Sequence, residues 1–176
     1  MAGHNKWKQI KERKAKTDAA KSRAFSKFAA LITAEARGAK GDRNAPGLRA
    51  VIERARKENM PQDNIERAIK KATETGTKEL MRARYEAYGP GGVAVLIDAL
   101  TDNSNKTAQE IKHLLSENGG NLAAPGAAAW AFEKTAEGWK PTTPTLLSDE
   151  DIAKLETLVE KLEEREDVQE VITNAE

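Results

Sequence analysis

The sequence contains no cysteine and few aromatic residues, and both shortages limit what the chain can do. Without cysteine, the 176 residues can form no disulfide, no thiolate nucleophile and no cysteine-ligated metal site. That usage is typical of a reducing compartment, so we expect a cytoplasmic protein. Aromatic side chains make up only 5% of the residues, so the core is predicted to consist mainly of Ala, Leu, Ile and Val.

Long apolar runs are also missing. No stretch approaches the roughly 20 apolar residues that a membrane-spanning helix needs. The charged N-terminus has no apolar segment after it, so we expect no secretory signal and no membrane partner. Hydrophobic residues at 39% and charged residues at 32% are typical of a soluble globular chain.

Residues for catalysis are scarce as well. The two histidines, His4 and His113, lie in different halves of the chain, and neither stands near a Ser or Asp arrangement in sequence. The acidic residues between 150 and 167 follow the polar face of an expected helix without metal-ligand spacing. The sequence therefore predicts a protein that is not an enzyme and that uses no cofactor, metal or small-molecule substrate.

The net charge of +1 hides a strong division between the two halves. Residues 1–78 hold 20 Lys and Arg against 9 Asp and Glu, whereas residues 79–176 hold 9 against 19. The halves thus carry net charges of +11 and −10. A division of this kind predicts a basic half that binds a partner and an acidic half that does not touch the same surface.

The basic half is predicted to contain a mobile arm and three helices. Residues 1–16 carry six cations and little apolar content, which indicates an arm that is mobile or orders on binding. Apolar residues at helical spacing predict helices over 18–37, from Pro46 to Asn59, and from Pro61 to a stop before Gly76. Three short helices, each with one apolar stripe, predict a small three-helix bundle.

The acidic half is predicted to alternate strands and helices. Strands are expected at 82–88, 93–100, 127–133, 141–147 and 168–173, and helices at 106–117 and from about 149 onward. From Val93 the order is strand, helix, strand, strand, helix, strand, which is the ferredoxin-like pattern with one extra strand in front. We therefore expect an α+β fold, with domains 1–78 and 79–176. The glycine-rich segment 89–92 precedes a strand and has no P-loop lysine, so a hairpin turn is expected there.

Clustered cations in the basic half are the candidate nucleic-acid-binding residues. Phosphate backbones favour such clusters because each neutralised phosphate releases condensed counterions. Trp7 and His4 lie among these cations and could stack on unpaired bases. The candidate set is His4, Lys6, Trp7, Lys8, Lys11, Arg13, Lys14, Lys16, Lys21, Arg23 and Lys27, with Arg67, Lys70 and Lys71 from the third helix.

Other interpretations of these charges stay open. The arm could be a solvated tail, and Arg49, Arg56 and Lys57 on the second helix could form ordinary pairs with nearby glutamates. The basic half could also bind an acidic protein, which would make the chain a protein–protein adaptor without nucleic-acid contact. An enzyme on the ferredoxin-like sheet would need a clustered acid or base, and the sequence offers none.

Several separate blocks of the sequence resemble the YebC/PmpR family. The matching blocks are MAGHNKW at 1–7, NMPQDNIERAI at 59–69, YGPGGVA at 88–94, TDN at 101–103, NGGNL at 118–122, and DVQEV at 167–171 with Asn174. The resemblance implies a helical N-terminal domain and two α/β domains. It also implies gene-expression control in the cytoplasm, as a probable transcriptional regulator on DNA or as a translation factor on ribosomal RNA or the ribosome. Relatives of this kind include a mitochondrial translational activator of cytochrome c oxidase.

The chain departs from that family pattern between residues 134 and 141. Members of the family carry a whole inserted domain there, whereas this sequence passes within a few residues to PTTP at 141–144. The expected gap falls between two strands of the ferredoxin-like core, so that core is predicted to close without the insertion.

Overall fold

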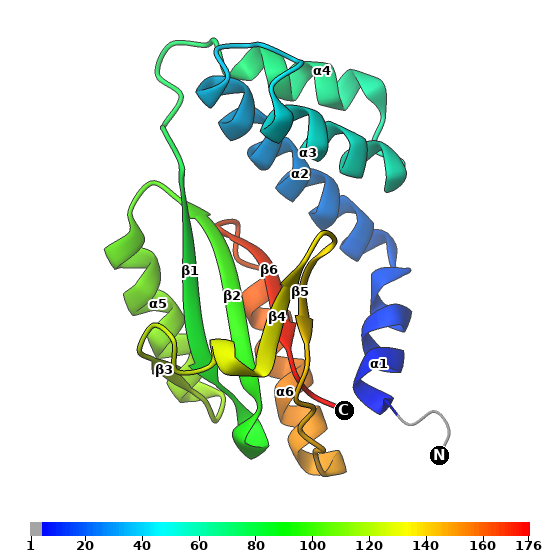
Figure 1. Ribbon diagram of the computed structural model, residues 1–176, viewed down its shortest axis with the longest axis vertical. Helices are drawn as coiled ribbons and strands as arrows, with labels where there is room; N and C mark the ends of the chain where they lie inside the picture. Colours follow the sequence, from blue (N-terminus) through cyan, green and yellow to red (C-terminus); the bar gives the residue numbers. More distant parts are fainter. Residues whose placement is uncertain (1–4) are drawn as a thin grey trace. The chain divides into compact units, whose positions relative to one another are not determined.

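The computed structural model describes residues 5–176, which form two compact units (Figure 1). Residues 15–81 make up a helical unit, and residues 82–176 together with the residues up to Lys14 make up an α/β unit. The predicted α+β class, with helices at the N-terminus followed by an α/β domain, is confirmed. The division itself differs from the expected boundary at residue 78, because the first helix packs with the second half of the chain.

The helical unit contains α2 (Asp18–Gly38), α3 (Pro46–Lys57) and α4 (Gln62–Lys71), close to the three helices that periodicity predicts. Thr17 caps α2 by accepting a hydrogen bond from the Ala20 amide, and Pro46 occupies the first turn of α3. Fully buried Ile32, Leu48 and Ile65 contribute one side chain from each helix to the core. The Thr33 hydroxyl donates to the Ala68 carbonyl at 2.8 Å and fixes where α2 and α4 meet.

The α/β unit is built on a four-stranded antiparallel sheet in the order β3-β1-β2-β6. Its strands are β1 (Met81–Tyr88), β2 (Ala94–Thr101), β3 (Asn121–Ala123) and β6 (Val168–Thr173). Helices α5 (Ser104–Glu117) and α6 (Asp149–Glu163) cover one face. The hairpin of β4 (Phe132–Thr135) and β5 (Gly138–Pro141) lies over the other, as Figure 1 shows.

The turn between β1 and β2 has the form expected of a hairpin connection. Gly91 and Gly92 have φ angles of 71° and 79°, which side chains with a Cβ rarely adopt, and the Gly89 amide donates to the Val93 carbonyl at 2.8 Å. A Cβ on Gly91 would also lie 2.5 Å from a Leu147 methyl carbon. Segment 89–92 is therefore a turn that the packing requires, in agreement with the sequence prediction.

The strand prediction for residues 127–133 is mostly wrong. The Glu86 carboxylate accepts hydrogen bonds from the backbone amides of Gly126, Ala128 and Ala129, which bends the segment into a turn and the short 3-10 helix η2 (Ala129–Ala131). Strand β4 begins only at Phe132. Backbone amides held by one carboxylate cannot also pair with a neighbouring strand.

The expected edge strand at 141–147 does not form as a continuous strand: Pro141 ends β5, and Thr145 makes an isolated bridge with Ala175. Buried Asn174 holds this segment instead, with its amide donating to the Thr143 carbonyl at 2.7 Å and to the Thr145 hydroxyl at 3.0 Å. Strands β4 and β5, which differ in position from the two central strands predicted from sequence, form a separate hairpin. Strand β1 takes the place beside β2 in the main sheet.

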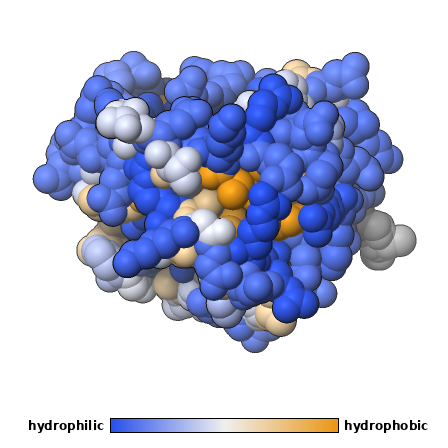
Figure 2. All heavy atoms as spheres, turned by 90° about the horizontal axis from the view of Figure 1, so that it is seen from above, coloured by the Kyte–Doolittle hydropathy of each residue, from blue (hydrophilic) through white to orange (hydrophobic). Residues whose placement is uncertain are grey.

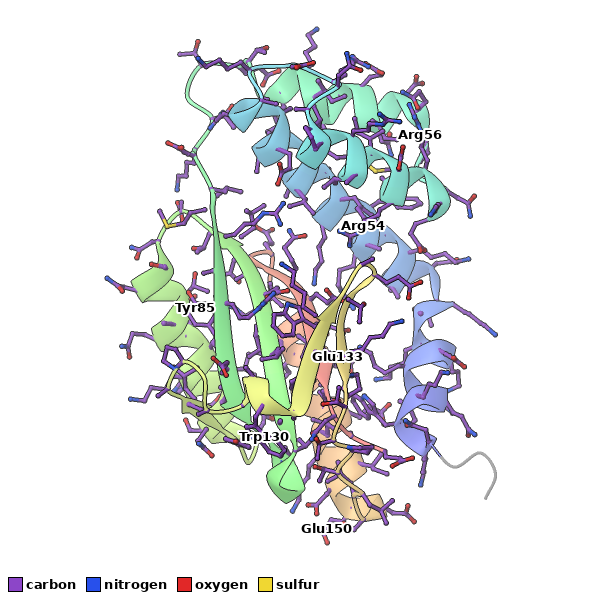
Figure 3. The ribbon with its side chains drawn as sticks, in the orientation of Figure 1. Arg54, Arg56, Tyr85, Trp130, Glu133 and Glu150 are labelled. Atoms are coloured by element: carbon purple, nitrogen blue, oxygen red, sulfur yellow. The ribbon has the colours of Figure 1, made fainter. Side chains whose placement is uncertain are left out.

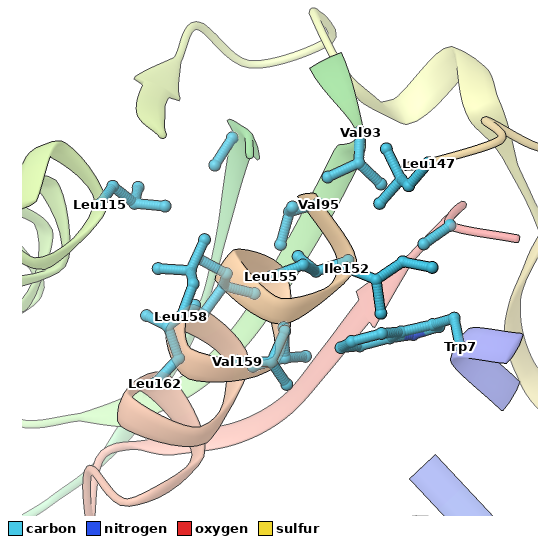
Figure 4. Close-up of a cluster of buried hydrophobic side chains, with 14 of the residues drawn as sticks. Trp7, Val93, Val95, Leu115, Leu147, Ile152, Leu155, Leu158, Val159 and Leu162 are labelled. Atoms are coloured by element: carbon cyan, nitrogen blue, oxygen red, sulfur yellow. The ribbon is translucent and has the colours of Figure 1, made fainter. Parts of the chain in front are cut away.

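Residues 6–15 of the expected N-terminal arm form a helix that packs on the α/β unit. Helix α1 (Lys6–Ala15) places Trp7 and Ile10 in the core shared with α5, α6 and the sheet. Trp7 is only 7% exposed, and Figure 4 shows its ring beside Ile152 and Val159 of α6. Trp7 is therefore shielded from an unpaired base while α1 stays docked, so its stacking on nucleic acid, which remains a prediction, would require α1 to move.

The burial of Trp7 predicts a measurable contribution to stability. Trp7→Ala should lower the free energy of unfolding by about 3 kcal/mol, the usual cost of emptying a buried aromatic site. Urea denaturation followed by circular dichroism measures the change. The matched control is Trp130→Ala, because Trp130 is 57% exposed. Equal losses in the two variants would contradict the docking of α1.

Candidate nucleic-acid interface

The cations of the expected interface fall into three groups with different surroundings. The first group lies on α1 and contains Lys6, Lys8, Lys11, Arg13 and Lys14. The second, which we call the α2 group, contains Lys16 just before α2 and Lys21, Arg23 and Lys27 in the first half of that helix. The third, the α4 group, contains Arg67, Lys70 and Lys71. The remaining candidate, His4, lies outside the described residues.

Three of the α1 cations pair with carboxylates of α6. The Lys6 Nζ lies 2.8 Å from a carboxylate oxygen of Asp149, and Lys11 pairs with Glu163. The Lys14 Nζ lies 2.9 Å from a carboxylate oxygen of Glu156 and 3.2 Å from one of Glu160. The hydrogen bond from Lys6 lowers the pKa of Asp149. These lysines are balanced within the protein, so they differ from the freely accessible cations that the sequence indicates.

The α2 group differs from the paired lysines in its contacts. Lys16 and Lys21 are exposed and Arg23 is half-buried. Within residues 5–176, none of these three has an ion pair or a side-chain hydrogen bond. Lys27 is half-buried and makes an interaction of its own. The structure therefore leaves three cations of this group with no carboxylate to balance them.

The α4 group covers the solvent face of its helix, opposite buried Ile65 and Ile69. Arg67 donates to the Asn64 side chain, whereas Lys70 and Lys71 have no ion pair among the described residues. Ala68 meets α2 at Thr33, and twelve residues of helix separate Thr33 from Lys21, a rise of about 18 Å. The α2 and α4 groups are thus separate clusters on one unit.

The arginines of α3 make contacts with neighbouring side chains. Arg54 lies over the Phe28 ring at 5.7 Å, and Arg56, labelled beside it in Figure 3, donates to Gln62 at 3.3 Å. Arg49 pairs with Glu53 at 3.5 Å, as the helix-pair interpretation expects. Contact of Arg54 with Phe28 was not evident from sequence, because the two residues lie on different helices.

The acidic unit exposes one aromatic residue that sequence reasoning missed. Trp130 on η2 is 57% exposed, and its indole nitrogen donates to the Tyr88 hydroxyl at 2.9 Å (Figure 3). Trp139 instead lies under Arg84, whose guanidinium carbon is 4.6 Å from the ring centre and which pairs with Asp98. No motif in the sequence distinguishes these two tryptophans, because their exposure depends on how the 124–131 segment folds.

The face drawn in Figure 2 is mostly hydrophilic, with a hydrophobic area near its centre. Across residues 5–176, no three His, Asp or Glu side chains gather in a way that could hold a metal ion. None of the helices described there combines the length and apolar composition needed to cross a bilayer.

These features define a two-unit α+β protein with unbalanced cations on its helical unit and an acidic α/β unit. Comparison with known proteins agrees with that class. The TACO1/YebC protein N-terminal domain matches residues 5–75, and the TACO1/YebC second and third domain matches residues 80–137 and 134–175. The chain therefore belongs to the TACO1/YebC family, which confirms the resemblance in its sequence blocks.

Several relatives have been named as probable transcriptional regulatory proteins. The one from Kosmotoga olearia is 46% identical over 98% of this chain and 70% of its own length. The one from Fervidobacterium nodosum is 54% identical over 76% of this chain, which spans about half of that relative (54%). A crystal structure of a conserved hypothetical protein, Aq1575 from Aquifex aeolicus, has a TM-score of 0.74 at 32% identity, covering 92% of this chain and 93% of that one. The relatives' name describes a regulator and not an enzyme.

Near the α4 group, the ion pair of Arg43 with Glu66 predicts an unusual titration. Hydrogen bonds from Arg43 and then from Gln62 lower the pKa of Glu66 to about 2 from its ordinary 4.5. Because the folded-state pKa is depressed, the pair stabilises the helical unit fully above pH 4.5. That contribution is lost as the pH falls from 4.5 through about 2. Carbon-detected NMR titration measures the value, and Arg43→Ala should raise it towards 4.5. An unchanged pKa in that variant would show that Arg43 is not the cause.

Proposed function

We propose that this protein is a cytoplasmic regulator of gene expression that binds nucleic acid through its helical unit. The observation that carries the proposal is the unbalanced charge of that unit. Residues 15–81 hold 15 Lys and Arg against 9 Asp and Glu, and Lys16, Lys21, Lys70 and Lys71 have no ion pair among the described residues. Neutralising phosphates with such cations releases counterions, which favours binding.

The α2 group is the strongest part of the proposed interface. Its unpaired members Lys16, Lys21 and Arg23 lie within seven residues of one another, about two turns, around the start of α2, so a single backbone segment could contact several of them. The α4 group, about 18 Å further along α2, could contact a second segment of the same duplex or folded RNA. Spacing of this kind suits an extended phosphate backbone better than a small acidic ligand.

The names of the relatives support regulation without deciding the target. A probable transcriptional regulatory protein would act on DNA, and this meaning extends to the present chain as part of the proposal. Ribosomal RNA in the ribosome presents the same phosphate chemistry, so both are included as targets in the experiment. A protein–protein adaptor remains the outcome if neither nucleic acid binds.

We also infer that the chain lacks a segment that longer relatives carry. The second and third domain of the family matches in two pieces that meet at residues 134–137, within the β4–β5 hairpin. The chain also spans only 54% of the Fervidobacterium relative. The hairpin pairs Phe132 with Pro141 through Thr135 with Gly138, so it closes locally. Contacts that a longer relative makes through that segment are therefore not part of the proposed function.

The interface is tested by removing the unpaired cations of the α2 group. The variant Lys16→Ala, Lys21→Ala, Arg23→Ala should bind more weakly, and the slope of log affinity against log salt should fall by about 2 to 3. Fluorescence anisotropy on labelled duplex DNA and sedimentation with ribosomes, both over a salt series, measure the effect. The matched control Lys106→Ala, Lys112→Ala, Lys134→Ala changes the net charge equally on the acidic unit.

The outcomes separate the alternatives. Selective, salt-sensitive binding to DNA would support transcriptional control, and salt-sensitive ribosome association with weak DNA binding would support a role in translation. An equal loss of binding affinity in the control variant would show that the weaker binding comes from the lower net charge and not from the α2 group. If the unmodified protein bound neither target, the proposed function would be wrong, and an acidic protein partner would be sought next.

A further inference from the structure

Helix α1 has one face that combines two apolar side chains with three lysines. At 100° per residue, Trp7, Ile10, Lys11 and Lys14 lie within about 100° of one another, and Lys6 lies at the edge of this arc. The opposite face carries Lys8 and Glu12, whose charged atoms lie 4.0 Å apart. All three lysines on the apolar face pair with α6. The docked face therefore contains most of the positive charge of the helix.

The partner surface on α6 is a single acidic stripe beside the apolar stripe. Its four residues follow spacings of seven, four and three, which place them on one side of the helix. They are Asp149, Glu156, Glu160 and Glu163. Ile152 and Val159, which flank this stripe, contribute to the same buried core as Trp7. These carboxylates line up beside the apolar side chains that pack against α1. They place a row of negative charges opposite the lysines of α1, as the phosphates of a nucleic-acid backbone would.

We propose that the contact between α1 and α6 is an autoinhibitory latch, in which the acidic stripe occupies three lysines that nucleic acid would otherwise neutralise. This inference rests on the proposed function, because the competing ligand is the same nucleic acid. Binding the α2 group brings phosphates close to α1, since Lys16 lies two residues beyond Lys14 in the chain. Phosphates then displace the carboxylates and draw α1 away from α6.

The exposure of the paired groups makes such an exchange physically reasonable. The side chains of Lys6, Lys11 and Lys14 are 54%, 36% and 37% exposed, so their charged ends remain in reach of solvent. Pairs of this kind are screened by salt and each contributes little to stability. Exchange of carboxylate for phosphate keeps every lysine paired. The main resistance to release is the burial of Trp7 and Ile10.

The charge of α1 changes with docking. Residues 6–14 contain five Lys and Arg and one Glu, a net of +4. With three lysines paired to α6, the remaining Lys8, Arg13 and Glu12 leave a net of +1. A docked α1 is therefore a weak phosphate ligand, and a released α1 is a strong one. The number of phosphates contacted, and with it the salt dependence of binding, should report the state of the latch.

The first part of the test weakens the latch from the α6 side. The variant Glu156→Gln, Glu160→Gln, Glu163→Gln keeps side-chain size while removing three of the carboxylates. It should bind labelled duplex DNA or single-stranded RNA about tenfold or more tightly, and the salt slope should steepen by about 2 to 3. The control Glu133→Gln, Glu164→Gln, Glu166→Gln raises the net charge equally, at positions that have no ion pair within residues 5–176.

The second part measures docking of α1 without any ligand. Hydrogen exchange of the amides in residues 6–15 should be faster in the latch variant than in the unmodified protein, and unchanged in the control variant. Faster exchange together with tighter, steeper binding supports the latch. Equal binding gains in both variants, or unchanged exchange in the latch variant, would overturn it while leaving the proposed function intact. Faster exchange without nucleic-acid binding by any variant would instead refute the proposed function, and with it the ligand of the latch.

Discussion

The packing of Trp7 against α6 determines which unit the N-terminal helix belongs to. It joins residues separated by about the whole length of the protein, as the Lys6–Asp149 pair shows with its separation of 143 residues. Because Trp7 is buried with Ile152 and Val159, the beginning of the chain belongs to the α/β unit. The helical unit is consequently inserted between α1 and β1 in the order of the chain, and it does not simply precede the α/β unit.

That contact also changes the meaning of the charge division in the sequence. A basic N-terminal half and an acidic C-terminal half suggest two surfaces that avoid one another. The structure instead pairs part of the basic half with the acidic helix and leaves the remaining excess of cations on residues 15–81. Charge counted along the sequence therefore overestimates the cations that a ligand can reach. Among the described candidate cations, those without an ion pair include Lys16, Lys21 and Arg23 of the α2 group and Lys70 and Lys71 of the α4 group.

Local patterns were enough to predict most elements but not their packing. Helices α2, α3, α4 and α6 and strands β1, β2 and β6 follow from apolar periodicity, capping residues and the glycine turn at 89–92. The errors occurred where a distant side chain determines the backbone. Glu86 bends residues 126–129 and Asn174 holds residues 143–145, and neither partner could be identified from nearby sequence. For the candidate site, cation-rich segments were evident, but the pairing of Lys6, Lys11 and Lys14 required the position of α6. The spacing of Trp7 and Ile10 by three residues was the available signal for α1.

The separation of α1 from α6 in the chain has a consequence during synthesis. The helical unit is complete once residue 81 has left the ribosome, and its contacts are local, so it can fold while the rest is still being made. Helix α1 cannot pack against α6 until α6, which ends at Glu163, has emerged near the end of translation. For most of its synthesis the nascent chain therefore carries Lys6, Lys11 and Lys14 without their α6 carboxylates, next to ribosomal RNA. Under the proposed latch, the nascent chain would therefore bind nucleic acid more strongly than the completed protein.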